Sequence, residues 1–288
     1  MQLLSVQNLC KNYDKFRLKD VSFSLDAGYI MGFIGPNGAG KTTTLKAMMG
    51  LVKKDGGRVF VMGRDFDEHE MDLKQHIGFS LGGVDYYAKI PLRRITSVVR
   101  RFYASWDDEA YRRYIRRFEL DEDKRPTELS GGMRVKYALA LALSHNARLL
   151  LLAEPTSGLD PVARDDLLEL FQELIEDGER SILFSTHITS DLEKCADYIT
   201  YIENGRIVES RARDELLAAY RVVKGTPEQY SAVSPRLISA KKHAFGFTGL
   251  MRTEDVRPED GLAAEAPALE DIMIYHARKE NGNEEPAV

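Results

Sequence analysis

The chain has 288 residues, of which 43% are hydrophobic and 30% are charged, so it can fill a core and has the composition of a soluble globular protein. The length favours one large domain with a smaller companion. The net charge of −5 at pH 7 argues against a general nucleic-acid binder, which would usually be basic.

Cysteine usage and hydropathy indicate an intracellular chain. The two cysteines, Cys10 and Cys195, are far apart in the sequence, which predicts neither a disulfide framework nor a zinc site and is typical of a reducing cytosol. The N-terminus lacks the basic start and the apolar core of a signal peptide. The longest purely apolar run, residues 137–143, is far shorter than the ~18 residues needed to span a bilayer. We therefore expect that any membrane role requires a separate partner.

The first part of the chain alternates between strand and helix patterns. Apolar and polar side chains alternate over residues 2–9 and 20–25, which predicts antiparallel strands. The elements predicted next are a buried strand at 29–34, a helix at 43–49, a hairpin around 54–57, a strand at 58–62 and another strand at 77–80.

Residues 91–118 predict two helices, broken near residue 105, with Asp107 as the N-cap of the second. The elements predicted after them are a helix at 130–146, a strand at 149–153, a helix at 161–177, a strand at 181–185, a helix at 189–196 and a strand at 198–202. Regular alternation of apolar strands with helices is the signature of parallel βαβ units, so we expect an α/β fold. The following Asn204-Gly205 pair predicts a two-residue hairpin turn.

The C-terminal part changes in character. We expect a main domain over residues 1–220 and a small α+β appendage over 221–288, without a catalytic motif of its own. The appendage contains an amphipathic helix at 269–275, and its last residues, 280–288, have a disordered composition.

A glycine-rich segment follows the strand at 29–34, precedes a helix and fits the pattern G-x-x-x-x-G-K-[ST], which is the context of a phosphate-binding loop. Its backbone N–H groups are expected to surround nucleotide phosphates. Lys41 should reach the β- and γ-phosphates, and the Thr42 hydroxyl should bind Mg²⁺. The predicted binding residues of this segment are Gly35, Pro36, Asn37, Gly38, Ala39, Gly40, Lys41, Thr42 and Thr43. The segment predicts a site for a nucleoside triphosphate.

Further segments carry a family resemblance. They are Leu129-Ser-Gly-Gly132 before a helix, Glu154 just past a buried strand, Ser157-Gly-Leu-Asp160 after it, and Ser185-Thr-His187 at the end of the next strand. In this order and spacing they resemble the ABC ATPases, the nucleotide-binding subunits of ABC transporters, over about residues 1–220. The Leu-Ser-Gly-Gly segment distinguishes the ABC ATPases from generic P-loop proteins, which lack it.

This resemblance implies a P-loop NTPase fold with an antiparallel β subdomain and a helical subdomain at about residues 85–146. It implies ATP and Mg²⁺ as cofactors. It also implies a second copy of the chain, or a paralogous ATPase subunit, as partner. The function implied is ATP hydrolysis coupled to transport by a separate transmembrane permease, on the cytoplasmic, inner face of the cell membrane.

The resemblance also implies roles for single residues. Glu154 follows a parallel strand at the end where doubly wound sheets place their ligand sites, and by resemblance it is the general base for the attacking water. His187 would contact the γ-phosphate and that water, although a structural histidine is an alternative. Asp160 would shape a dimer contact. Tyr13 would stack on the adenine, unless it is an ordinary aromatic side chain of an edge strand.

Ser130 and the N–H groups of Gly131 and Gly132 lie at a predicted helix N-terminus, which is a second anion site. A phosphate already held by the glycine-rich loop does not need a second binding segment in the same chain. We therefore expect a head-to-tail dimer in which this signature closes on the ATP of the other subunit, as the resemblance implies. The alternative is a simple N-capped helix with a glycine pair.

The chain departs from the family pattern at two positions. The family usually has Asp immediately before the catalytic Glu, where this chain has Ala153, and it usually has Gln where the chain has Gly82. Thr42 is then the one protein ligand to Mg²⁺ that the sequence predicts. Because phosphoryl transfer depends on the metal, we expect nucleotide binding to persist and hydrolysis to be slow.

Two other functions remain open at this point. One is a soluble ABC protein that acts on ribosomes or DNA. Such proteins usually carry two cassettes or a long coiled-coil insertion, and this chain has a single motif set. The other is a nucleotide-gated pseudo-ATPase, which Ala153 favours. Within the transporters, runs at 102–106, 138–144 and 187–192 resemble a bacterial exporter-like subgroup.

Overall fold

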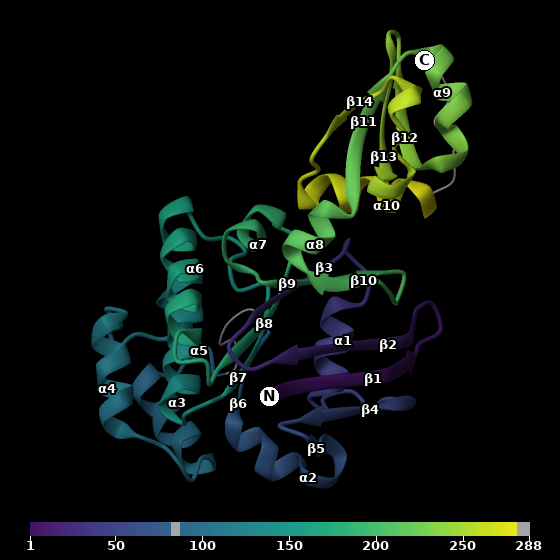
Figure 1. Ribbon diagram of the computed structural model, residues 1–288. Coiled ribbons are helices and arrows are strands. Elements are labelled where there is room, and N and C mark those ends of the chain that lie inside the picture. Colours follow the sequence, from purple (N-terminus) through teal and green to yellow (C-terminus); the bar gives the residue numbers. More distant parts are fainter. Residues whose placement is uncertain (82–86, 281–288) are drawn as a thin grey trace. The chain divides into compact units, whose positions relative to one another are not determined.

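The computed structural model describes residues 1–81 and 87–280, and the chain divides after Ser210 into two compact units (Figure 1). Gly82 lies outside the described residues. So does the predicted disordered tail, apart from its first residue, which ends the last helix. Within the described ranges, no helix is both long enough and apolar enough to pass through a membrane.

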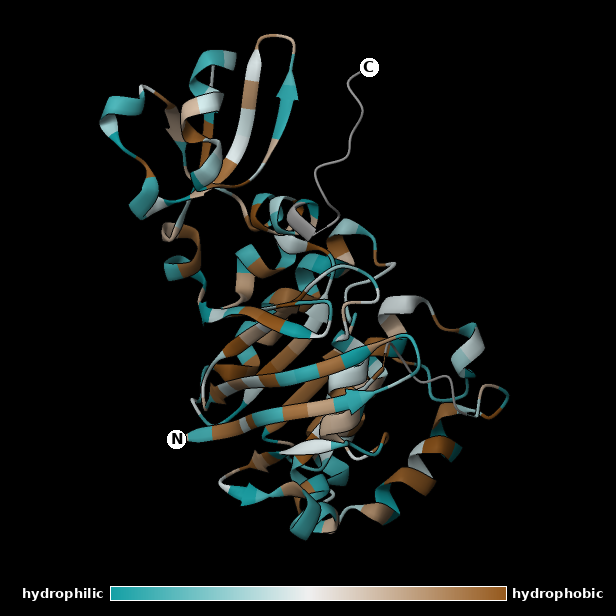
Figure 2. Cartoon of the chain, turned by 90° about the vertical axis from the view of Figure 1, so that its right-hand side faces the viewer, coloured by the Kyte–Doolittle hydropathy of each residue, from teal (hydrophilic) through white to brown (hydrophobic). Residues whose placement is uncertain are grey.

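The first unit begins with an antiparallel sheet. Strands β1 (Gln2–Asn12) and β2 (Arg17–Asp26) pair antiparallel, with Val6 opposite Phe23, which confirms the prediction for this part of the chain. Strand β4 (Gly56–Val61) pairs with the other edge of β1, and the two-residue strand β5 (Arg64–Asp65) completes the order β2-β1-β4-β5. Hydrophilic and hydrophobic residues alternate along the strands near the N-terminus (Figure 2).

The predicted hairpin at residues 54–57 is wrong. This segment leads from helix α1 (Lys41–Met48) into β4, and β4 pairs with the distant strand β1. The glycine signal has another cause, because a Cβ atom on Gly57 would lie 2.4 Å from the carbonyl oxygen of Asn8. The chain reverses later, between β4 and β5, where Met62 and Gly63 both adopt positive φ.

A six-stranded sheet in the order β10-β9-β3-β8-β7-β6 forms the centre of the first unit. Its strands are β3 (Ile30–Ile34), β6 (Ile77–Ser80), β7 (Leu149–Ala153), β8 (Ser181–Thr186), β9 (Tyr198–Glu203) and β10 (Arg206–Ala212). The neighbours from β9 to β6 pair in parallel, as the βαβ pattern predicts. Asn204 and Gly205, both at positive φ, form the predicted tight turn between β9 and β10.

Helices complete the first unit. They are α1, α2 (Phe66–Leu73), α3 (Leu92–Val99), α4 (Asp108–Arg117), α5 (Gly131–Ser144), α6 (Pro161–Ile175) and α7 (Thr189–Cys195). The side chain of Asp107 accepts hydrogen bonds from the backbone N–H groups of Glu109 and Ala110 at 2.8 and 3.0 Å, so it is the N-cap of α4 that the sequence predicts.

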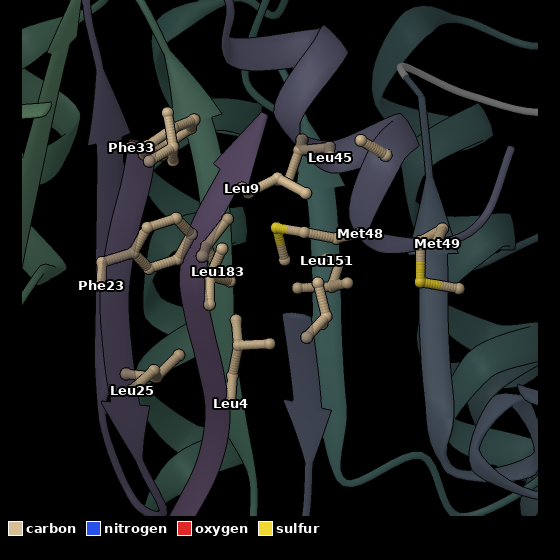
Figure 3. Close-up of a cluster of buried hydrophobic side chains, with 14 of the residues drawn as sticks. Leu4, Leu9, Phe23, Leu25, Phe33, Leu45, Met48, Met49, Leu151 and Leu183 are labelled. Atoms are coloured by element: carbon tan, nitrogen blue, oxygen red, sulfur yellow. The ribbon is translucent and has the colours of Figure 1, made fainter. Parts of the chain in front are cut away.

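The core of the first unit lies between the two sheets and around α1 (Figure 3). Leu151 of β7 and Leu183 of β8 lie side by side on one face of the central sheet, where Leu45 of α1 packs with them. From the antiparallel sheet, Phe23 brings its ring to 5.4 Å from that of Phe33 on β3. This packing fixes α1, and therefore the loop before it, against the ends of the central strands.

The second unit begins at Arg211 and is an α+β structure. Its antiparallel sheet has the order β12-β13-β11-β14, and its helices are α8, α9 and α10. The bounds are α8 (Arg213–Ala218), β11 (Tyr220–Gly225), α9 (Pro227–Val233), β12 (Leu237–His243), β13 (Gly246–Arg252), β14 (Ala263–Glu265) and α10 (Leu269–Glu280). Val223, Phe247 and Met251 form its own small core.

Candidate nucleotide-binding site

An open cavity of about 740 Å³ lies where β3, β8 and β7 end. The carboxyl ends of parallel strands meet at one edge of a sheet, and ligand sites form at such edges. The residues that line the cavity are Tyr13, Lys15, Phe16, Pro36, Asn37, Gly38, Gly40, Lys41, Thr42, Thr43, Glu154 and His187. The fold therefore brings most of the predicted loop residues together with the two predicted catalytic residues.

The glycine-rich loop connects β3 to α1 and surrounds the Lys41 side chain. The buried Lys41 ammonium donates hydrogen bonds to the carbonyl oxygens of Gly35 at 2.6 Å and Pro36 at 3.3 Å. Burial lowers the pKa of Lys41 below its ordinary value, and the nearby charge of Glu154 partly opposes this shift. The loop thus holds a cation at the base of the cavity without a carboxylate bonded to it.

The first turn of α1 faces the same cavity. Its N-cap is Gly40, at φ 116°, and no side chain caps the turn. A Cβ atom at this position would lie 2.7 Å from the Leu18 side chain, so the conformation and the packing both require glycine. The N–H groups at the start of a helix have no partner within the helix, and the uncapped turn leaves them available to an anion.

Glu154 and His187 form a pair across the cavity from the loop. Nδ1 of His187 lies 2.8 Å from Oε2 of Glu154, and both side chains are partly exposed. The Glu154 backbone is left-handed, at φ 49°, and its N–H donates to the carbonyl of Ser185 at 2.8 Å. Non-glycine residues adopt this conformation at an energetic cost and mostly where the surrounding structure enforces it, as at functional sites.

Residues of the turn between β1 and β2, two of them aromatic, also line the cavity. Tyr13 is half-exposed, and its backbone N–H donates to the carbonyl of Phe16 at 2.8 Å in the turn between β1 and β2. Lys15 and Phe16 also line the cavity, and no prediction from the sequence included them. No motif marks them, because only the turn brings them to the loop.

The remaining predicted residues do not line the cavity. Gly35 and Ala39 belong to the loop but do not line the cavity. Ser130, Gly131, Gly132 and Asp160 form a second locus, where the two glycines pack against the Leu159 side chain. These residues do not face the nucleotide cavity of their own chain.

The second locus consists of two capped helix N-termini. The Ser130 hydroxyl accepts from the N–H of Met133 at 3.2 Å and so caps α5. The Asp160 carboxylate accepts from the N–H groups of Ala163 and Val162, each at 3.0 Å, and these bonds hold its pKa below the ordinary value. The N-terminus of α5 has a neutral cap and keeps a positive potential that suits an anion, whereas the Asp160 carboxylate already compensates the N-terminus of α6.

The residues of the cavity fit a magnesium ion that is held mainly by a bound nucleotide. Magnesium keeps several waters and is usually bound through one or two protein groups together with substrate phosphates. The Thr42 hydroxyl is exposed at the cavity and suits that role. Over residues 1–81 and 87–280, no group of three or more His, Cys, Asp or Glu side chains could hold a metal ion alone.

Comparisons with known proteins identify the family of the chain. A family model described as ABC transporter matches residues 18–157. The ABC transporter ATP-binding protein YtrB of Bacillus subtilis (strain 168) is 31% identical over 219 residues, covering 76% of this chain and 75% of that protein. The linearmycin resistance ATP-binding protein LnrL of the same strain is 32% identical over 221 residues, covering 74% of this chain and 70% of that one.

A solved structure of the ATP-binding subunit of an ABC transporter has the same fold, with a TM-score of 0.67 and 28% sequence identity. The match covers 74% of this chain and 91% of that chain. The predicted P-loop α/β fold is therefore confirmed, and the chain belongs to the ABC ATPase family as an ATP-binding subunit of an ABC transporter.

Proposed function

We propose that this chain binds ATP with Mg²⁺ in the cavity at the ends of β3, β8 and β7, and that it drives a separate transmembrane permease from the cytoplasmic face of the membrane. The observation that carries the proposal is the meeting of the glycine-rich loop with the Glu154–His187 pair in one cavity. Family membership supports the permease as partner. The described helices include none that could cross a membrane, which is consistent with this division of labour.

Lys41 and the first turn of α1 bind the phosphates of the nucleotide. The Lys41 ammonium exchanges the two loop carbonyls for the β- and γ-phosphate oxygens, while the N–H groups of the first turn of α1 donate to the same phosphates. Tyr13 and Phe16 offer aromatic faces on which the adenine can stack. Thr42 would hold Mg²⁺, which supplies charge neutralisation on the phosphates when bound.

Glu154 and His187 act in the hydrolysis step. The Glu154 carboxylate orients the attacking water and accepts its proton, as a general base. His187 donates from Nδ1 to Glu154 and keeps its second nitrogen, Nε2, for a γ-phosphate oxygen or the water. The hydrogen bond between the two side chains fixes them relative to each other.

The second locus supports a head-to-tail dimer. The N-terminus of α5 is an anion site that does not line the cavity of its own chain, and the Asp160 carboxylate caps the neighbouring helix α6. A partner chain would bring its Ser130–Gly132 segment onto the nucleotide held here, with Asp160 at the contact. The partner is a second copy or a paralogous ATPase subunit.

We further propose that hydrolysis is slow, because the last residue of β7 is Ala153. A carboxylate at this position would add a ligand for the metal shell, and the buried methyl group of Ala153 cannot. The alanine at this position also favours the pseudo-ATPase as a second candidate function. The exporter-like subgroup remains a prediction from sequence.

The test compares Mg²⁺-dependent ATP turnover of the native chain, Ala153→Asp and Ala153→Asn. Asparagine matches aspartate in size without its charge, so it controls for the added volume. We expect Ala153→Asp to raise turnover by about tenfold or more, equivalent to ~1.4 kcal/mol of transition-state stabilisation, and Ala153→Asn to leave it low. Equal rates in the native chain and Ala153→Asp would contradict the proposal, and zero turnover in the native chain would favour the pseudo-ATPase.

A further inference from the structure

The hydroxyl group of Ser185 is buried without a hydrogen-bond partner. Ser185 lies near the end of β8, is fully inaccessible to solvent, and finds no donor or acceptor for its Oγ atom within the described part of the chain. An unsatisfied buried hydroxyl costs about 1–3 kcal/mol, and each such group in a folded protein needs an explanation.

The strand register places this hydroxyl directly beside the position of the missing carboxylate. Ser185 pairs with Phe33 of β3 on one side and with Ala153 of β7 on the other. Paired residues of parallel strands point to the same face of a sheet, and this is the face on which Leu45 of α1 packs. The neighbours of the hydroxyl across the strands are thus an aromatic ring and a methyl group.

Ser185 also contacts a residue of the candidate site through its backbone. The Ser185 carbonyl accepts the hydrogen bond from the N–H of Glu154, and His187 follows two positions later on the chain. Ser185 therefore lies between the strand that carries the proposed general base and the strand that leads into the phosphate loop. Ser185 itself does not line the cavity, but it precedes His187 by two residues and pairs with the residue before Glu154, and both of those side chains line it.

We propose that Ser185 is a positioning residue that accepts a hydrogen bond from a water of the magnesium shell when Mg-ATP occupies the site. Magnesium releases its waters reluctantly, and a water bound to a cation is a strong donor. The Ser185 hydroxyl supplies an uncharged acceptor where Ala153 supplies none. This inference rests on the proposed function, because it requires nucleotide and metal in the cavity.

The test measures the Mg²⁺ concentration that gives half-maximal tightening of ATP binding, by calorimetry or with a fluorescent ATP analogue, in the native chain and Ser185→Ala. Loss of one hydrogen bond should raise this concentration about three- to tenfold. Binding of ATP without metal should not change. The melting temperature of the nucleotide-free protein should stay the same or rise, since the substitution removes an unsatisfied polar atom.

Ser181→Ala is the matched control. Ser181 lies on the same strand and the same face and is equally buried, but its hydroxyl donates to the carbonyl of Asp26 at 2.7 Å. This variant should lower the melting temperature and leave the Mg²⁺ dependence as in the native chain. An unchanged Mg²⁺ dependence in Ser185→Ala, or the same shift in both variants, would overturn the inference while the proposed function stands. Failure of the native chain to bind ATP would overturn both.

Discussion

His145, which follows α5, is a buried side chain that the fold keeps uncharged. Its ring stacks on that of Tyr103, with centroids 3.7 Å apart, and its Nδ1 donates to the carbonyl of Gln75 at 2.9 Å. Burial lowers the pKa of His145 from 6.5 to about 4. Between these two pH values the unfolded chain binds more protons than the folded one, so stability is complete above pH 6.5 and is lost as the pH falls towards 4.

We predict that this residue alone removes up to about 3 kcal/mol of the free energy of unfolding between neutral pH and about pH 4. The replacement His145→Phe keeps an aromatic ring against Tyr103 but cannot take up a proton. Urea unfolding across this pH range should therefore show a shallower decline for the variant than for the native chain, although its stability at neutral pH is lower. Parallel curves for the two proteins would show that His145 does not control the acid response.

Among the helices, a buried network of hydroxyl groups joins α3, α4 and α5. The Thr96 hydroxyl of α3 lies 2.8 Å from the Tyr111 hydroxyl of α4 and 2.9 Å from the Tyr137 hydroxyl of α5. Tyr137 also donates to the carbonyl of Leu92 at 3.1 Å. The network links the three helices by polar contacts that are shielded from water, so each bond has a specific direction and partner.

Removal of one hydroxyl from this network should cost stability without affecting the nucleotide site. We expect Tyr137→Phe to lower the free energy of unfolding by about 1–3 kcal/mol, because it leaves the Leu92 carbonyl without this donor. Tyr114→Phe, which removes a hydroxyl from a partly exposed tyrosine of α4, should change it by less than about 0.5 kcal/mol. Denaturant unfolding and ATP titration of both variants would check this, and equal losses in the two would argue against the network.

The periodicity of the sequence predicts most of the elements of the first unit, because one face of each is buried. Strands β6 and β7 have the predicted bounds, and the predicted helix before β7 is α5, capped by Ser130. Two short elements were missed. Strand β5 has two residues, too few for an alternating pattern, and α2 shows only a local signal, the Asp65 side chain that accepts from the N–H of Asp67 at 2.9 Å.

In the candidate site too, residues within a sequence motif could be predicted and residues outside one could not. Residues of the glycine-rich loop, Glu154 and His187 were found from motifs, and the parallel sheet then brings them together at the ends of its strands. Phe16 depends on the turn between β1 and β2, and Ser185 depends on strand register and on the absence of a partner for one atom. Neither feature has a pattern in the sequence, because both arise from contacts between distant segments.

At the scale of the whole molecule, the candidate nucleotide cavity and the Ser130–Gly132 segment at the start of α5 are separate features of the described residues. These two features are complementary in charge when a nucleotide fills the cavity, since its phosphates are anionic and the N-terminus of α5 carries positive potential. One chain cannot use both for the same ligand. Two chains in opposite orientation satisfy both at once and create two equivalent sites.

We predict that ATP and Mg²⁺ convert the chain from monomer to dimer, and that Gly131→Trp abolishes the dimer while the monomer still binds ATP. Gly131 is half-buried at the start of α5, and a Cβ atom there would meet its nearest neighbour at 3.6 Å, an ordinary contact, so the added ring should project over the helix N-terminus. Ser97→Trp places the same bulk on an exposed position of α3 and should dimerise like the native chain. Light scattering with and without nucleotide separates the outcomes: dimers of Gly131→Trp would exclude the signature from the interface, and loss of ATP binding in that variant would place it in the cavity of its own chain.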